Sequence, residues 1–154
     1  MNKIMGKKFT VIGISVRTTN ENGQAGTDIV RLWERFVTEK IVDKIPNKVD
    51  GTIYSIYTDY ESDHTKPYTT ILGCEVTNTN SIPKGMVAKT IMDADYSKFT
   101  AKGDLTKGVV YKEWTKIWHT KLERTYSADF EVYSEKSQNP TDAEVEIFVG
   151  INIS

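Results

Sequence analysis

The stretch Asp129-Phe130-Glu131-Val132-Tyr133 predicts a β-strand that carries a carboxylate between two apolar residues. If Glu131 is shielded from water, its carboxyl group either becomes neutral through a raised pKa or takes a positive partner. The sequence offers no obvious internal partner, so a cation from outside the chain becomes a candidate ligand. The alternative is that Glu131 faces water while Phe130 and Val132 face the core, because side chains alternate across a strand.

The size and composition of the chain predict one domain over residues 1–154. A hydrophobic share of 38% in 154 residues is sufficient for a single core. The 20 Lys and Arg residues against 21 Asp and Glu residues give a net charge of -1, and no basic run is present. Direct binding to nucleic acid through phosphate neutralisation is therefore disfavoured.

No stretch approaches the roughly 20 apolar residues of a membrane span, and the N-terminal residues lack the apolar run of a signal peptide. We therefore expect a cytoplasmic protein that does not bind a membrane. The single cysteine, Cys74, lies in the stretch TILGCEV at 70–76 and is expected to be a small buried side chain. His64 and His119 lack metal-ligand spacing and are expected at the surface, and no cofactor or metal motif is found.

Hydrophobic periodicity predicts the same order of elements in both halves of the chain. In the first half we expect a strand over 9–16, a helix from Thr27 or Asp28 to about Val42, and strands over 52–58 and 68–77. In the second half we expect a strand over 85–92, a helix over 105–122, and strands over 129–133 and 145–153.

This order is βαββ repeated twice, with half-repeats at approximately 8–77 and 84–154. Setting Trp33 against Trp114 brings Phe36 against Ile117, and the following strands bring Ser55 against Glu131. Two copies of about 70 residues are expected to pair into one pseudo-twofold α+β domain with an antiparallel sheet. The seam between the halves is a common place for a cleft, and a groove is expected there.

Several stretches share a known pattern. They are VRTTN at 16–20, LWERF at 32–36, YTDYESD at 57–63, GCEV at 73–76, IPKG at 82–85, DFEVY at 129–133 and VEIFV at 145–149. With them the chain resembles, over nearly its whole length, the GyrI-like effector-binding domains, which also form the C-terminal ligand-binding part of AraC-type and MerR-type multidrug regulators. The resemblance implies a duplicated βαββ fold whose groove holds bulky, flat organic cations over a buried glutamate, and that glutamate falls on Glu131.

In most such proteins this domain follows a DNA-binding module, whereas this chain begins almost directly at its first strand. A stand-alone binding domain is therefore expected, acting in drug sensing or sequestration. Trp33 and Trp114 occupy equivalent points on the two helices, and Tyr133 shares a strand face with Glu131. These residues are the candidate walls of the groove, with Tyr60 added from the hairpin pattern of the family.

The competing interpretation of each tryptophan is core packing, which we favour for Trp118. Two other functions stay open. Some members of the resembled family hydrolyse strained cyclopropane-bearing compounds, and Glu131 with Tyr133 or Tyr60 would supply the base and the acid. Others interact with gyrase. The sequence leaves open the natural ligand, turnover, a separate regulator as partner and the oligomeric state.

Overall fold

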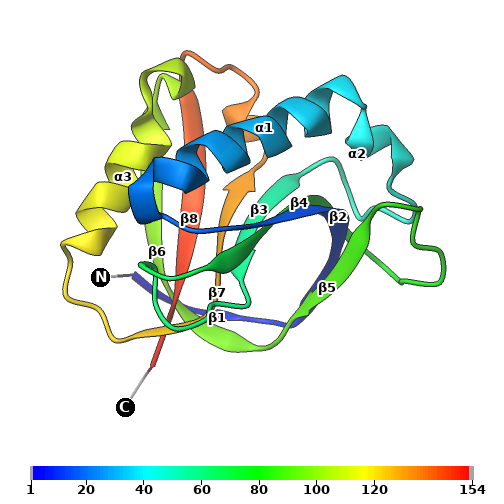
Figure 1. Cartoon of the computed structure of the whole chain (residues 1–154). Helices are drawn as coiled ribbons and strands as arrows, with labels where there is room; N and C mark the ends of the chain where they lie inside the picture. Colours follow the sequence, from blue (N-terminus) through cyan, green and yellow to red (C-terminus); the bar gives the residue numbers. More distant parts are fainter. Residues whose placement is uncertain (1, 153–154) are drawn as a thin grey trace.

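The computed structural model, which describes residues 2–152, contains one antiparallel sheet and two principal helices (Figure 1). The elements are β1 (Asn2–Gly6), β2 (Phe9–Thr18), α1 (Gln24–Thr38), α2 (Ile41–Lys44), β3 (Ile53–Thr58), β4 (Tyr68–Val76), β5 (Val87–Ile91), β6 (Ala94–Gly103), α3 (Val109–Trp118), β7 (Arg124–Tyr133) and β8 (Ala143–Ile151). The strand order is β1-β6-β8-β7-β3-β4-β2-β5, and all the pairings are antiparallel. The prediction of an α+β fold is confirmed.

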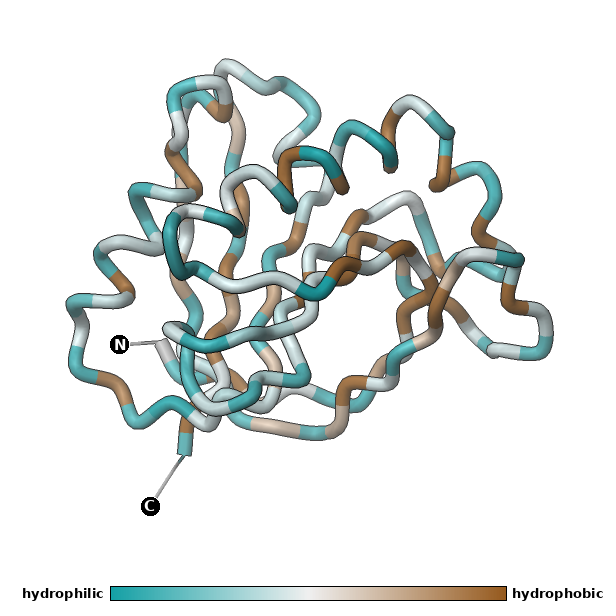
Figure 2. Tube along the Cα trace, viewed as in Figure 1, coloured by the Kyte–Doolittle hydropathy of each residue, from teal (hydrophilic) through white to brown (hydrophobic). Residues whose placement is uncertain are grey.

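The sheet is strongly curled, and α1 and α3 lie over the same face of it (Figure 1). An apolar cluster beneath α1 includes Phe36 and Leu72, and a separate cluster beneath α3 includes Ile117 and Ile147. A third cluster, which includes Phe130, packs on the opposite face of the sheet. Figure 2 shows hydrophobic positions recurring along the helices and strands that build these clusters. Because the two helix-covered clusters stay separate, the sheet between them is free to form a site.

The centre of the sheet carries the pseudo-twofold relation between the halves. The order β3-β4-β2-β5 on one side of the centre matches β7-β8-β6-β1 on the other. Ser55 and Glu131, which the repeat alignment equates, lie directly opposite each other in the β3–β7 pair. The symmetry axis therefore passes through this pair, while the exact bounds of the half-repeats stay a prediction.

Two strands were not predicted, β1 and β6. The β6 segment looks polar because Lys98, Lys102 and several hydroxyl residues interrupt its apolar positions. Lys98 and Lys102 instead form ion pairs with Glu146 and Glu144 on the neighbouring strand β8. The predicted strand over 85–92 corresponds to β5, an additional strand, and β6 is the strand that precedes α3 in the repeat.

The helix bounds also differ from the prediction. Helix α1 begins at Gln24 after a left-handed Gly23, so neither Thr27 nor Asp28 is its N-cap. It ends at Thr38, and a left-handed Lys40 separates it from α2. The predicted helix over 105–122 is a 3-10 turn at Leu105–Lys107 followed by α3, because the left-handed Gly108 interrupts the helical backbone.

The strand predicted over 129–133 is the second part of the longer strand β7, and the last strand is Ala143–Ile151; residue 153, where its end was predicted, lies outside the described residues. The pairing of β7 with β8 shifts register between Arg124 and Asp129, and Tyr126 has a positive φ of 53° in this irregularity. Cys74 is fully buried, as predicted.

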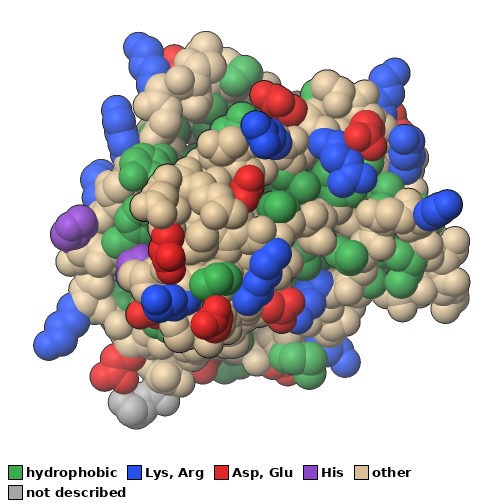
Figure 3. Space-filling model, viewed as in Figure 1, with side chains coloured by type: hydrophobic (Ala, Val, Ile, Leu, Met, Phe, Trp, Pro, Cys, Tyr) green, Lys and Arg blue, Asp and Glu red, His purple; other side chains and the backbone are tan. Residues whose placement is uncertain are grey.

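Basic and acidic side chains are interspersed on the face shown in Figure 3. No helix in the part of the chain that the structure describes is long and apolar enough to cross a membrane.

The close approach of β2 and β4 depends on two facing glycines, Gly13 and Gly73. A Cβ atom on Gly13 would lie 1.9 Å from the carbonyl oxygen of Leu72, which belongs to the backbone and cannot rotate away. We expect Gly13→Ala to lower the free energy of unfolding by about 1–3 kcal/mol or more, measured by denaturant unfolding. Gly51→Ala is the control, because nothing lies within 4 Å of its Cβ position. Equal stability of the two variants would contradict this account.

Candidate functional site

A cavity of about 270 Å³ lies between α1 and α3, above the centre of the sheet. Its largest wall side chains are Trp33 on α1 and Trp114 and Trp118 on α3. Tyr57, Glu131 and Tyr133 from β3 and β7 also line it. The groove predicted between the halves is thus present, and all five predicted site residues, Glu131, Trp33, Trp114, Tyr133 and Tyr60, line it.

Glu131 is 2% exposed and does not face bulk water. Its Oε1 atom accepts a hydrogen bond from the Tyr133 hydroxyl at 2.6 Å. Its Oε2 atom accepts hydrogen bonds from the Tyr57 hydroxyl and the Trp114 indole nitrogen, each at 2.7 Å. No Lys or Arg within residues 2–152 forms an ion pair with it.

Burial raises the pKa of Glu131, and the hydrogen bonds from Tyr133, Tyr57 and Trp114 offset only part of this effect. The pKa values of Tyr57 and Tyr133 are raised well above the ordinary value, first by burial and then by the nearby Glu131 charge. Both hydroxyls therefore keep their protons and act as donors. The carboxyl group is held by neutral donors and lacks a compensating charge.

The aromatic walls follow the pseudo-twofold relation. The ring of Trp33 packs edge-on against Tyr133 at 5.0 Å, and the ring of Trp114 packs edge-on against Tyr57 at 5.7 Å between centroids. The symmetry is broken at the polar contact, because only Trp114 donates to Glu131. Trp114 is 8% exposed and also belongs to the apolar cluster beneath α3.

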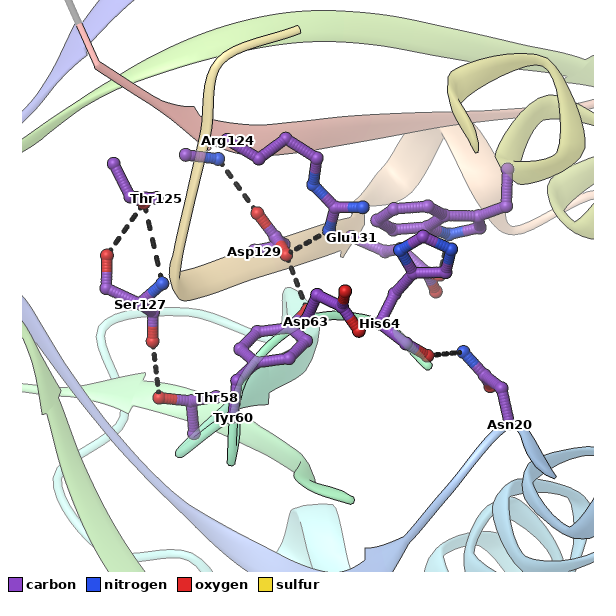
Figure 4. A network of polar contacts seen from close by, with 12 residues as sticks. Asn20, Thr58, Tyr60, Asp63, His64, Arg124, Thr125, Ser127, Asp129 and Glu131 are labelled. Atoms are coloured by element: carbon purple, nitrogen blue, oxygen red, sulfur yellow. Dashed lines mark hydrogen bonds and ion pairs between the residues drawn. The ribbon is translucent and has the colours of Figure 1, made fainter. Parts of the chain in front are cut away.

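Tyr60 lines the cavity, but its hydroxyl donates to Asp129 at 2.5 Å rather than to Glu131. Asp129 is fully buried and also accepts hydrogen bonds from the Gly150 amide at 2.8 Å and from Arg124 at 2.7 Å (Figure 4). A second buried carboxylate therefore lies two residues from Glu131 on the same strand. Unlike Glu131, it has a cationic partner.

Several lining residues were missed by sequence reasoning. Tyr57 could have been found, because the repeat alignment sets it against Tyr133. Asn20 and Arg124 carry no periodic signal. Asn20 accepts from the Tyr68 hydroxyl and donates to the backbone carbonyl of His64, each at 2.7 Å, which holds the β3–β4 loop at one end of the cavity.

His119 is exposed as expected, and His64 is partly exposed. His64 is half-buried and stacks on Trp118 at 5.7 Å and 11° and on Tyr126 at 6.3 Å and 22°. Burial and the Arg124 charge lower the pKa of His64, and the nearby Asp63 charge partly opposes this. Trp118, predicted to be core, packs at the edge of the α3 cluster and also lines the cavity.

Chemically, the site offers one carboxylate, aromatic faces and hydroxyl donors. Such a set attracts a cation whose charge is spread over an apolar body. No group of three or more potential metal-ligating side chains was found in the part of the chain covered by the structure.

A curled antiparallel sheet with a ligand-sized cavity beneath two helices defines an effector-binding protein. The chain belongs to the Cass2 family of integron-associated effector binding proteins, a GyrI-like effector-binding family whose model matches residues 5–151.

Individual relatives agree with this assignment. YobU of Bacillus subtilis strain 168, described as a candidate transcriptional regulator, is 26% identical over 149 residues, which are 94% of this chain and 92% of YobU. The integron cassette protein VCH_CASS2 from the mobile metagenome of Vibrio cholerae is 29% identical, with a TM-score of 0.75 and coverage of 98% of this chain and 95% of that one.

SAV2435, whose structure is bound to tetraphenylphosphonium, has a TM-score of 0.80 at 17% identity. The match covers 98% of this chain and 93% of that protein. At this identity the likeness shows the shared fold.

The raised pKa of Glu131 predicts a specific pH dependence of stability. Between the unfolded pKa of about 4.3 and the raised folded pKa, the folded protein binds more protons than the unfolded chain, so stability falls as pH rises. Glu131→Gln lacks this titration. We expect the unfolding free energy of the wild type relative to the variant to be lower at pH 8 than at pH 4, measured by denaturant unfolding. A relative gain of the wild type at pH 8 would contradict the prediction.

The Arg124–Asp129 pair is expected to be costly to break from one side. The two side chains are 6% and 0% exposed, so Asp129→Asn leaves a buried guanidinium without its counter-charge. We expect a loss of about 3–5 kcal/mol in unfolding free energy, measured by denaturant unfolding. The double variant Arg124→Met with Asp129→Asn removes both charges and should lose less than the single variant. A larger loss in the double variant would show that the charge pair is not the cause.

Proposed function

We propose that the protein binds aromatic or otherwise bulky organic cations in the cavity between α1 and α3, with Glu131 as the charge-selecting group. The observation that carries this proposal is a buried carboxylate at an aromatic-lined cavity with no ion-pair partner in the described residues. An isolated buried charge is costly, and a ligand cation would relieve this cost.

The type of cation follows from the hydrogen bonds. Tyr57, Tyr133 and Trp114 already donate to the carboxylate, so little acceptor capacity is left for a ligand that needs several hydrogen bonds. A delocalised or quaternary cation needs none, and it loses less hydration on entering an apolar cavity than a compact ammonium group. The electron-rich faces of Trp33 and Trp114 would add cation–π attraction.

One protein of the same fold and the description of the family both support the proposal. SAV2435, a protein of the same fold, is bound to tetraphenylphosphonium, which is a cation of this type. The family description as effector binding fits a role in sensing or sequestering such compounds.

Hydrolysis is the second candidate function. The hydroxyls of Tyr133 and Tyr57 lie at 2.6 and 2.7 Å from the two oxygens of Glu131, which is within reach for proton transfer. Product formation from a strained cyclopropane-bearing compound, lost in Glu131→Gln, would support this function.

Binding of tetraphenylphosphonium tests the principal proposal. Glu131→Gln keeps the shape of the side chain and removes its charge, so affinity should fall by about 1–3 kcal/mol, or roughly 5- to 150-fold. Calorimetry or tryptophan fluorescence would measure it. Tetraphenylborate has nearly the same outline with the opposite charge and should bind the wild type poorly.

Glu144→Gln is the matched control. It removes the same charge from β8, where Glu144 pairs with Lys102 and Lys136 outside the cavity. This variant should bind tetraphenylphosphonium as the wild type does. Equal affinity of the wild type and Glu131→Gln, or equal binding of the cation and the borate anion, would overturn the proposal.

A further inference from the structure

The guanidinium group of Arg124 makes fewer hydrogen bonds than a buried group normally does. Its side chain is 6% exposed and lines the cavity. Arginine has five N–H donors, but within residues 2–152 only one hydrogen bond forms, from Nη2 to Asp129 at 2.7 Å. The Nε atom is buried and finds no partner among the described residues. Buried donors are normally satisfied, so such a group points to a missing acceptor.

His64 also lines the cavity and also has a buried nitrogen without a hydrogen-bond partner among the described residues. Its ring stacks on Tyr126, and the Arg124 guanidinium lies over that same ring at 4.4 Å from the centroid. The Nδ1 atom of His64 is buried, and no described residue gives it a hydrogen-bond partner. Figure 4 shows Arg124 beside Asp129, and Arg124, His64 and Glu131 line the same cavity.

Trp114 connects this wall to the carboxylate. Its indole nitrogen donates to Glu131 at 2.7 Å, and its ring centroid lies 5.9 Å from the Cζ atom of Arg124. The carboxylate and the guanidinium are therefore both neighbours of a single indole ring. A small aromatic ligand that contacts this ring would therefore lie near both groups.

We propose that Arg124 and His64 form a subsite that binds a hydrogen-bond acceptor of the ligand, so that the cavity prefers aromatic cations that carry a neutral carbonyl group. This inference rests on the proposed function, because it assumes that the cationic part of the ligand lies near Glu131. The carbonyl oxygen would accept hydrogen bonds from the spare N–H donors of Arg124.

The charges decide between a neutral and an anionic acceptor. Asp129 already compensates Arg124, which leaves Glu131 as the carboxyl group without a counter-charge among the described residues. A cation with a neutral carbonyl group balances it, whereas a carboxylate on the same ligand would restore a negative charge beside Asp129 and Glu131. A carboxamide is therefore favoured over a carboxylate.

Three ligands of one framework test the subsite: 1-benzylpyridinium, its 3-carbamoyl derivative and its 3-carboxylate. Quenching of tryptophan fluorescence would report binding, since Trp33, Trp114 and Trp118 line the cavity. We expect the carbamoyl compound to bind roughly tenfold more tightly than the parent cation, and the carboxylate to bind no better than the parent. Equal affinity of the carbamoyl compound and the parent, or tightest binding of the carboxylate, would overturn the inference.

Two variants assign the preference to its residues. Arg124→Lys keeps a positive charge opposite Asp129 but removes the spare guanidinium donors, and His64→Phe keeps a stacking ring without its nitrogens. Each should reduce the ratio of carbamoyl to parent affinity towards one. Arg35→Lys is the control, because Arg35 pairs with Glu39 on the exposed side of α1, and it should keep the wild-type ratio. An unchanged ratio in both test variants would contradict the assignment.

The result for tetraphenylphosphonium separates the two proposals. If this cation binds in a Glu131-dependent manner while the carbamoyl group gives no advantage, the subsite is wrong and the proposed function holds. If neither tetraphenylphosphonium nor any pyridinium ligand binds, both proposals fail.

Discussion

The burial of the Glu131 carboxylate at the centre of the sheet is the constraint on which the site depends. Three neutral donors hold its two oxygens, and these donors come from β3, β7 and α3. The contacts fix the position of α3 relative to the sheet as well as the orientation of the carboxylate. They leave the charge itself without compensation, because hydrogen bonds from neutral groups offset only part of the cost of burial.

The neighbouring Asp129 is a second buried carboxylate on the same strand, and its environment differs from that of Glu131. Its oxygens accept from Tyr60, Gly150 and Arg124, so its charge has a direct counter-charge. This network connects the two strands where the pairing of β7 with β8 shifts register. One acidic residue thus has a counter-charge, whereas the other lines the cavity and has none among the described residues.

The sequence predicted elements well where a hydrophobic pattern reflects burial. It predicted them poorly where contacts with residues distant in the sequence determine the structure. The helices around Trp33 and Trp114 followed from periodicity, whereas strand alternation alone left the direction of Glu131 open and the family pattern indicated it. Strand β6 escaped prediction because its lysines are stabilised by glutamates on β8, which no local pattern reveals. His64 and Arg124 reach the cavity from a loop and from an irregular strand end, where neither a helical nor a strand period applies.

The exchange of outer strands between the halves has a mechanical consequence. Strand β5 of the second sequence half pairs with β2 of the first, and β1 of the first half pairs with β6 of the second, so the two sequence halves are joined at both flanks as well as at the central β3–β7 pair. Separating the two sequence halves would therefore break three ladders of backbone hydrogen bonds at once, those of β1 with β6, β2 with β5 and β3 with β7. The frame around the cavity is therefore held by strand pairings that interleave the two halves of the chain.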